Sequence, residues 1–140
     1  QAITILLDAN DKIYYFEGIP NYNDPHFLKE TSYSADGIRA ILIRKSAFAV
    51  QQKKDLDQKK LLRKINDAQY SKMLSDIKSA KQTPTVIIKA TDQANYKNLV
   101  DALDEMQICS IGKYVIDVMK SSDKQLITNL KNGTAGQPQQ

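Results

Sequence analysis

Two short apolar runs, each bounded by turn-forming residues, constrain most strongly what this chain can fold into. Residues 3–7 (ITILL) and residues 12–16 (KIYYF) are rich in β-formers and are separated by the turn-forming stretch 8–11, so they predict an opening β-hairpin. Residues 85–90 (TVIIKA) contain consecutive apolar positions, which is typical of an interior strand buried on both faces. The chain is therefore expected to be built on a β-sheet.

Helical periodicity dominates the segment between these runs. Ser34 can cap a helix that the apolar spacing predicts over residues 35–50. Residues 51–82 contain no Gly or Pro, and their thin apolar stripe predicts a second, partly solvated helix over about 57–80. Pro84 ends this helical region.

The remaining segments complete the order of elements. Residues 18–33 hold two prolines and several turn formers, so they predict a loop. Thr91 or Asp92 can cap a third helix, which has apolar residues at helical spacing. A final strand is predicted over residues 111–119.

The predicted order is β-β-α-(α insert)-β-α-β, which belongs to the α+β class. We expect a small mixed β-sheet with helices packed on one face. Residues 1–120 are predicted to form one domain with a basic helical insert at 51–82, and residues 121–140 a C-terminal extension that is disordered from about 133. Because the sequence begins at the edge of a strand, we also expect it to be part of a longer protein.

Positive charge is concentrated in the insert. The whole chain of 140 residues has a net charge of +4. Residues 51–81 contain nine Lys or Arg and four Asp, a net charge of +5, so the rest of the chain sums to −1. A cluster of this kind is either a solvated helical face or a contact for an anionic polymer or an acidic partner. The candidate contact residues are Lys53, Lys54, Lys59 and Lys60.

Catalytic and metal chemistry find little support in the sequence. His26 is the only histidine and lies in the predicted loop, where it is expected to face solvent rather than act as a general base. Cys109 is the only cysteine, and its apolar neighbours predict a small buried residue. One His and one Cys do not make a zinc ligand set, and the five glycines form no phosphate-binding loop. We therefore expect no enzymatic activity, no metal and no cofactor.

The aromatic run at 14–16 raises the question of nucleic-acid binding. Aromatic side chains on a sheet can stack on bases. In a strand, however, Tyr14 and Phe16 face one way and Tyr15 the other, and the RNA-recognition signature is absent. Core packing is therefore the predicted role of these rings.

A longer pattern resembles a known family. Residues 89–96 (KATDQANY), followed by the apolar and acidic positions of 99–104, resemble the second half of the periplasmic domains of the ExbD/TolR family. In that family a strand ends in a basic residue and Ala, an acidic cap follows, and a Tyr lies several residues into an amphipathic helix. Residues 3–8 with 12–14 resemble the first hairpin of the family. The resemblance covers about residues 1–50 and 84–119.

Two positions depart from the family pattern. Thr91 stands where the family usually has Asp, with Asp92 one place later. Ser110 stands where the family usually has Gly, at the turn before the last strand.

The resemblance implies the periplasmic domain of a proton-motive-force motor subunit in a Gram-negative envelope. Such a subunit is a single-pass inner-membrane protein whose transmembrane helix, with its proton-carrying Asp, would lie outside this sequence. It implies a homodimer, an ExbB/TolQ-type channel as partner, and coupling to a TonB-like protein or to peptidoglycan. A sheet edge can pair with a second copy or a partner strand. The candidate edges are residues 111–118 and the hairpin 3–16, and the residues expected to pair are Tyr114, Ile116 and Val118.

The alternative interpretation is a soluble basic module that binds nucleic acid or another anionic polymer. The net charge and the basic insert support it. The resemblance makes the motor subunit the leading interpretation, in which no nucleic-acid partner is expected.

Overall fold

The protein is described by a computed structural model over residues 2–79 and 84–138. Within these ranges, five strands form one mixed sheet in the order β3-β2-β1-β4-β5. They are β1 (Ala2–Leu7), β2 (Ile13–Glu17), β3 (Lys29–Thr31), β4 (Thr85–Ala90) and β5 (Tyr114–Val118). The hairpin β1–β2 and the pair β2–β3 are antiparallel, whereas β1–β4 and β4–β5 are parallel. The predicted α+β class with a small mixed sheet is confirmed.

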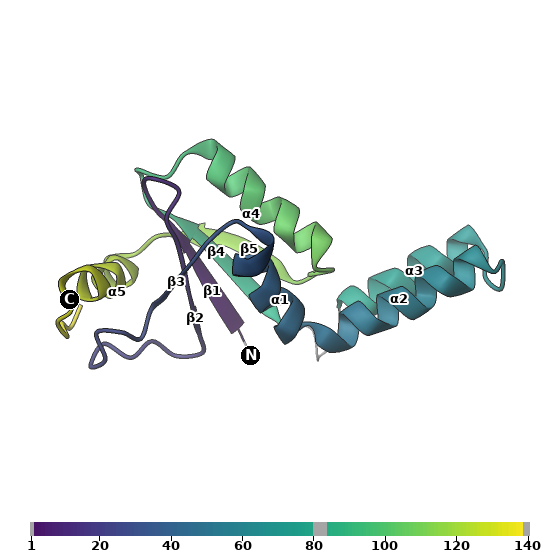
Figure 1. Ribbon diagram of the computed structural model, residues 1–140, viewed down its shortest axis with the longest axis horizontal. Coiled ribbons are helices and arrows are strands. Elements are labelled where there is room, and N and C mark those ends of the chain that lie inside the picture. Colours follow the sequence, from purple (N-terminus) through teal and green to yellow (C-terminus); the bar gives the residue numbers. More distant parts are fainter. Residues whose placement is uncertain (1, 80–83, 139–140) are drawn as a thin grey trace.

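Helices lie on both faces of this sheet (Figure 1). The helical segments are η1 (Ala35–Arg39), α1 (Ala40–Lys45), α2 (Ala47–Leu61), α3 (Asp67–Lys78), α4 (Tyr96–Ile108) and α5 (Ser121–Asn132). Helices α1 and α4 cover one face and α5 lies on the other, while α2 and α3 project away from the sheet as a helical hairpin. The sequence predicts helices on one face of the sheet. The structure has an additional helix, α5, on the second face.

The first face of the sheet carries the larger core. Ile5, Leu7 and Ile88 point to this face because alternate residues of a strand share a side. They pack against η1 and α1 and against α4, which contributes Met106. Cys109, at the end of α4, is fully buried in the same cluster, so its predicted burial is confirmed.

The second face carries a smaller core under α5. Leu6, Tyr14 and Phe16 lie on this face and pack with Leu126 and Ile127 of α5. Tyr14 is 2% exposed and Phe16 5% exposed, so both rings are core residues as predicted and neither can stack on a base.

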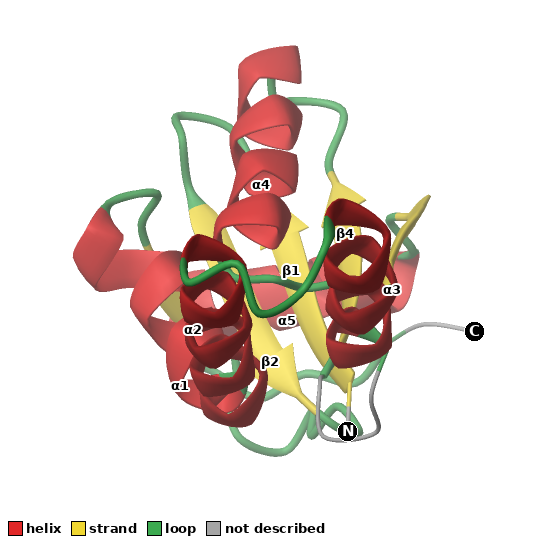
Figure 2. Ribbon diagram, turned by 90° about the vertical axis from the view of Figure 1, so that its right-hand side faces the viewer, coloured by secondary structure: helices red, strands yellow, loops and turns green. Residues whose placement is uncertain are grey.

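The long helical region differs from its prediction. The helix expected over 35–50 is divided, because Gly37 has φ −92° and ψ −122° and Ser46 separates α1 from α2. The helix expected over 57–80 is also wrong, because α2 ends at Leu61 and α3 begins at Asp67. Within the described part of that range, the turn between them produces an antiparallel pair instead of one long rod, and the two helices lie side by side (Figure 2).

The base of the helical hairpin packs closely against the chain that leads into β5. A Cβ atom at Gly112 would lie 2.5 Å from Lys78 Cβ and 2.9 Å from the Lys78 carbonyl oxygen, so only glycine fits there. Between the two helices, Ala49 and Leu56 of α2 and Ile77 of α3 form a small core of their own.

Two shorter predictions are also corrected. Helix α4 is capped by Asn95, whose side chain accepts from the Asn98 backbone N–H at 2.9 Å, and not by Thr91 or Asp92. The loop predicted over 18–33 contains the three-residue edge strand β3. Short polar strands of this kind carry no periodicity long enough to detect.

Ser110 ends helix α4 in the left-handed region, with φ +58°. Its N–H donates to the Gln107 carbonyl at 3.2 Å, and the next residue, Ile111, donates to the Met106 carbonyl at 2.8 Å. This pattern is a Schellman motif, in which glycine is preferred because a Cβ is strained at positive φ. The departure from glycine at this position therefore leaves the turn geometry intact and introduces strain.

We expect Ser110→Gly to raise the free energy of unfolding by about 1 kcal/mol, because glycine removes that strain. Urea unfolding followed by circular dichroism measures the change. The matched control is Ser71→Gly in the middle of α3, which has no positive φ and is expected to lose about 0.5 kcal/mol. A loss of stability in Ser110→Gly would contradict the assignment.

A buried ion pair fixes the start of α5 on the sheet. Lys89 Nζ of β4 lies 2.9 Å from Asp123 Oδ2, and the two side chains are only 12% and 6% exposed. The same carboxylate accepts a hydrogen bond from the Lys120 backbone N–H at 2.9 Å, which caps the helix.

Asp123→Ala is expected to lower the free energy of unfolding by about 3–5 kcal/mol, because it leaves the Lys89 charge buried without a partner. Asp76→Ala is the matched control, since Asp76 pairs with Lys72 on the surface of α3 and such pairs contribute well under about 1 kcal/mol. Equal effects of the two variants in urea unfolding would show that α5 is not held by this pair.

Candidate partner-binding site

Strand β5 forms an open, apolar edge of the sheet. It stands last in the strand order, so among the described residues β4 is its one strand neighbour. All five of its residues are exposed, and its four apolar side chains range from 38% exposed for Tyr114 to 71% for Val118. An exposed apolar edge strand is a template for pairing with another chain.

The register shows which backbone groups face outward. Val86 of β4 is opposite Tyr114, and its N–H donates to the Lys113 carbonyl at 2.8 Å. In a parallel ladder a residue bonds to the residues before and after the one opposite to it. Alternate residues of β5 therefore turn their N–H and C=O groups toward β4, and the outward set contains Tyr114, Ile116 and Val118.

The three predicted edge residues are thus placed on the open edge, although their use in pairing remains a prediction. One of their outward donors is already satisfied, because the Val118 N–H donates to Asp117 Oδ1 at 2.8 Å. The remaining outward groups are concentrated at Tyr114 and Ile116. The hairpin 3–16 is not an edge as predicted, because β1 lies between β2 and β4 and β2 lies between β1 and β3.

A groove runs beside this edge. Its volume is about 340 Å³, and it lies between α4 and the carboxyl ends of β4 and β5. Ile116 and Val118 line one side and Leu99 of α4 lines the other, while Asp92 and Lys124 supply charge. A strand laid along β5 could place an apolar side chain in this groove.

Sequence reasoning missed Val115 and Tyr96 as surface residues. Val115 is 52% exposed in β5, on the side opposite to Ile116. Tyr96 is 79% exposed at the first position of α4. No feature of the sequence distinguishes an exposed Val-Ile run from a buried one, because exposure depends on where the strand lies in the sheet.

The four predicted lysines lie elsewhere, on α2. Lys53 Nζ is 2.9 Å from Asp57 Oδ2, and Lys60 Nζ is 3.3 Å from Asp67 Oδ1. Lys54 and Lys59 are exposed. The structure does not bring these cations to the β5 edge, so the two sets of candidate residues form separate surfaces (Figure 1).

The two residues considered for catalysis, His26 and Cys109, lie in different parts of the fold. His26 is exposed in the loop between β2 and β3. Burial, with a smaller contribution from Glu105, raises the pKa of the Cys109 thiol to about 11, so the thiol stays protonated at neutral pH. Across residues 2–79 and 84–138, no three His, Cys, Asp or Glu side chains gather closely enough to hold a metal ion.

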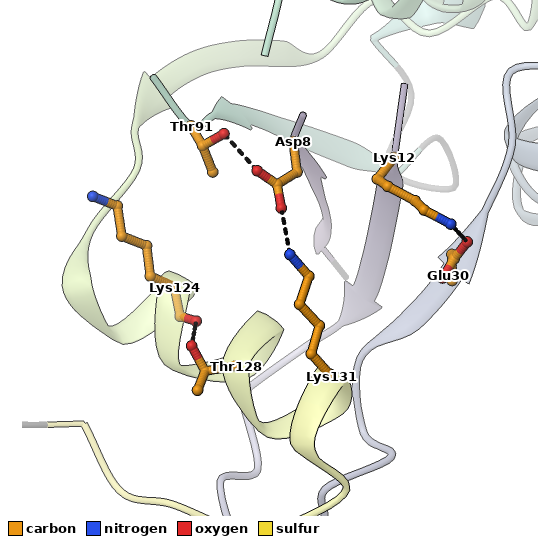
Figure 3. Close-up of polar contacts among 7 residues, drawn as sticks. All are labelled: Asp8, Lys12, Glu30, Thr91, Lys124, Thr128 and Lys131. Carbon is orange, nitrogen blue, oxygen red and sulfur yellow. Dashed lines mark hydrogen bonds and ion pairs between the residues drawn. The ribbon is translucent and has the colours of Figure 1, made fainter. Parts of the chain in front are cut away.

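A polar cluster at the end of β1 fastens the C-terminal helix to the sheet (Figure 3). Asp8 Oδ1 accepts from Thr91 Oγ1 at 2.8 Å, and Asp8 Oδ2 lies 3.3 Å from Lys131 Nζ of α5. Burial by itself raises the pKa of Asp8, but the hydrogen bonds from Thr91 and the Ala9 backbone and the Lys131 charge outweigh it, so the pKa lies below its usual range.

The lowered pKa of Asp8 predicts a dependence of stability on pH. The ionised carboxylate contributes fully above the unfolded pKa of about 3.9, and the contribution is lost as pH falls through the lower folded pKa. We expect Asp8→Asn to cost about 1–3 kcal/mol at pH 7 and to flatten the loss of stability below about pH 4. Urea unfolding at several pH values measures this, with Asp76→Asn as the exposed control; parallel pH curves for Asp8→Asn and wild type would contradict it.

Comparison with known proteins identifies the family. Residues 1–121 match the family described as biopolymer transport protein ExbD/TolR. The match covers most of the chain, so this protein belongs to the ExbD/TolR family, as residues 89–96 and the opening hairpin indicated. No curated protein and no solved structure matches the chain.

Membership carries a general role. The family serves energy transduction in biopolymer transport and is a non-enzymatic transport accessory family. It is anchored in the inner membrane with a periplasmic domain, and it generally works with ExbB/TolQ and TonB-like partners. Within the described ranges, no helix has the length and apolar character needed to cross a bilayer.

Proposed function

We propose that this chain is the periplasmic domain of a proton-motive-force-driven motor subunit. It couples an ExbB/TolQ-type proton channel in the inner membrane of a Gram-negative cell to a partner that acts at the outer membrane. Family membership supports the general role, and the open apolar edge of β5 is the observation that supports the coupling contact.

The chemistry of the β5 edge favours a polypeptide partner. Outward N–H and C=O groups at Tyr114 and Ile116 match the backbone of a second strand, and the apolar side chains match those of a partner strand. A glycan offers neither a backbone ladder nor apolar side chains. The proposal therefore assigns β5 to a second copy of this chain or to a TonB-like strand, and leaves peptidoglycan anchoring as the less supported form of coupling.

Self-association through β5 is tested with Ile116→Lys. The variant removes apolar area worth about 1.5–3 kcal/mol and places like charges across a two-fold pair, so dimerisation should weaken more than about tenfold in sedimentation equilibrium. The control is Ile19→Lys, since Ile19 is 89% exposed in a loop outside β5, and it should dimerise like wild type. A wild type that stays monomeric, or an Ile116→Lys variant that associates normally, contradicts pairing of two copies at β5.

Coupling to a partner is tested in cells that express the complete subunit. Ile116→Lys should abolish energy-dependent uptake across the outer membrane, whereas Ile19→Lys should retain it at equal protein level. Normal uptake with Ile116→Lys would overturn the assignment of β5 as the coupling edge.

A further inference from the structure

The net positive charge of the helical hairpin, residues 47–78, is confined to its tip. The turn segment 59–64 (KKLLRK) contains four cations and no acid. Residues 47–58 and residues 65–78 each contain two cations and two acids, so each of these arms sums to zero. The tip cations are Lys59, Lys60, Arg63 and Lys64, of which the last two were absent from the sequence-based set.

Two leucines are exposed among these cations. Leu61 is 81% exposed and Leu62 56% exposed, whereas Leu56, one turn earlier on α2, is 5% exposed in the small core of the hairpin. Ile65, directly after the tip, still packs against this core, whereas Leu61 and Leu62 are left outside it.

The turn itself holds a cation in a strained position. Arg63 has φ +59°, its N–H donates to the Lys60 carbonyl at 3.0 Å, and the Lys64 N–H donates to the Lys59 carbonyl at 2.9 Å. This is the Schellman motif described for α4, where glycine is the unstrained choice. Compared with glycine, an arginine at this position lowers the stability of the turn and adds a positive charge to the tip.

The tip is also well placed to touch a flat surface. The hairpin projects away from the sheet, and its turn is its farthest part from the sheet (Figure 1). Interactions below the turn hold its two arms together: Tyr70 Oη donates to Asp57 at 2.6 Å, and Lys60 Nζ lies 4.6 Å from the centre of the Tyr70 ring. Lys59, Arg63 and Lys64 are the tip cations left outside this network, since Lys60 also pairs with Asp67.

We propose that the tip 59–64 docks on the surface of a bilayer that contains anionic lipid. Cations next to exposed leucines match a bilayer, which offers anionic headgroups and hydrocarbon within a few ångströms of each other. A soluble polyanion would neutralise the cations and leave Leu61 and Leu62 in water. The combination therefore favours a membrane over a nucleic acid or a glycan.

The hairpin is followed in the chain by β4, which begins at the same end of the sheet as β1, because Ala2 is opposite Thr85. In the proposed function the complete subunit is anchored in the inner membrane, and that membrane is the bilayer on which the tip docks. Only this identification of the bilayer rests on the proposed function. Binding of vesicles tests the tip without any motor activity.

The test uses the protein of residues 1–140 in cosedimentation with phosphatidylcholine vesicles that contain 30% phosphatidylglycerol. Each cation near an anionic surface strengthens binding about fivefold, so the triple variant Lys59→Gln, Arg63→Gln, Lys64→Gln should bind on the order of a hundredfold more weakly. The matched control, Lys29→Gln, Lys54→Gln, Lys72→Gln, removes the same charge from exposed positions outside the tip and should bind within about threefold of wild type. Equal losses in the two triple variants would overturn the proposal.

The leucines separate a bilayer from a soluble polyanion. Leu61→Ser with Leu62→Ser should weaken vesicle binding about tenfold and leave binding to heparin unchanged, because only the bilayer buries these side chains. Binding to heparin or DNA without binding to anionic vesicles would instead establish a polyanion site and overturn the membrane assignment. Either result leaves the β5 dimerisation assay unaffected, so the two proposals can fail independently.

Arg63→Gly separates folding from binding. It removes the strained arginine, so the melting temperature should rise, while the loss of one cation should weaken vesicle binding about fivefold. A variant that is more stable and binds vesicles as tightly as wild type would show that Arg63 takes no part in docking.

Discussion

The parallel pairing of β1 with β4 is the contact on which the rest of the structure depends. It joins Ala2–Leu7 to Thr85–Ala90, with β2 and β3 added on one side and β5 on the other. Its register also assigns the two faces, because Ile5 and Ile88 share the side of α4 while Lys89 points toward α5. A shift of one residue in β4 would turn Lys89 into the larger core, away from Asp123, and turn Ile88 toward α5, which makes the register strongly specified.

This pairing also explains how a helical hairpin can be inserted into the domain. The chain must return from α1 to the start of β4, so an insertion is tolerated when its two ends lie close together, and an antiparallel helix pair meets that condition. The close approach of Lys78 to Gly112 then brings the hairpin base against the segment that enters β5. The projecting arm and the open edge are therefore joined through one packed contact, although they form separate surfaces.

The sequence predicts the elements whose pattern is local. Short-range rules predict the apolar runs of β1 and β4, the shared face of Tyr14 and Phe16, and the burial of Cys109. The structure confirms these predictions. The break between α2 and α3 has one local signal, the capping box of Asn66 and Gln69 at the start of α3, but the end of α2 is unmarked because the turn uses Arg63 at positive φ where glycine is usual. The position of β5 at the edge and of α5 on the second face follows from strand order and tertiary packing, which no local pattern contains.

The hydrogen bond from the Val118 N–H to Asp117 limits how much of β5 a second strand can use. With that donor occupied, the complete outward pairs of N–H and C=O groups are those of Tyr114 and Ile116, so an incoming strand gains a short ladder. A short ladder gives a contact with a fast dissociation rate, since most differences in affinity between related complexes arise from dissociation. Under the proposed function, a partner strand would therefore bind at this edge and dissociate again within each transport cycle.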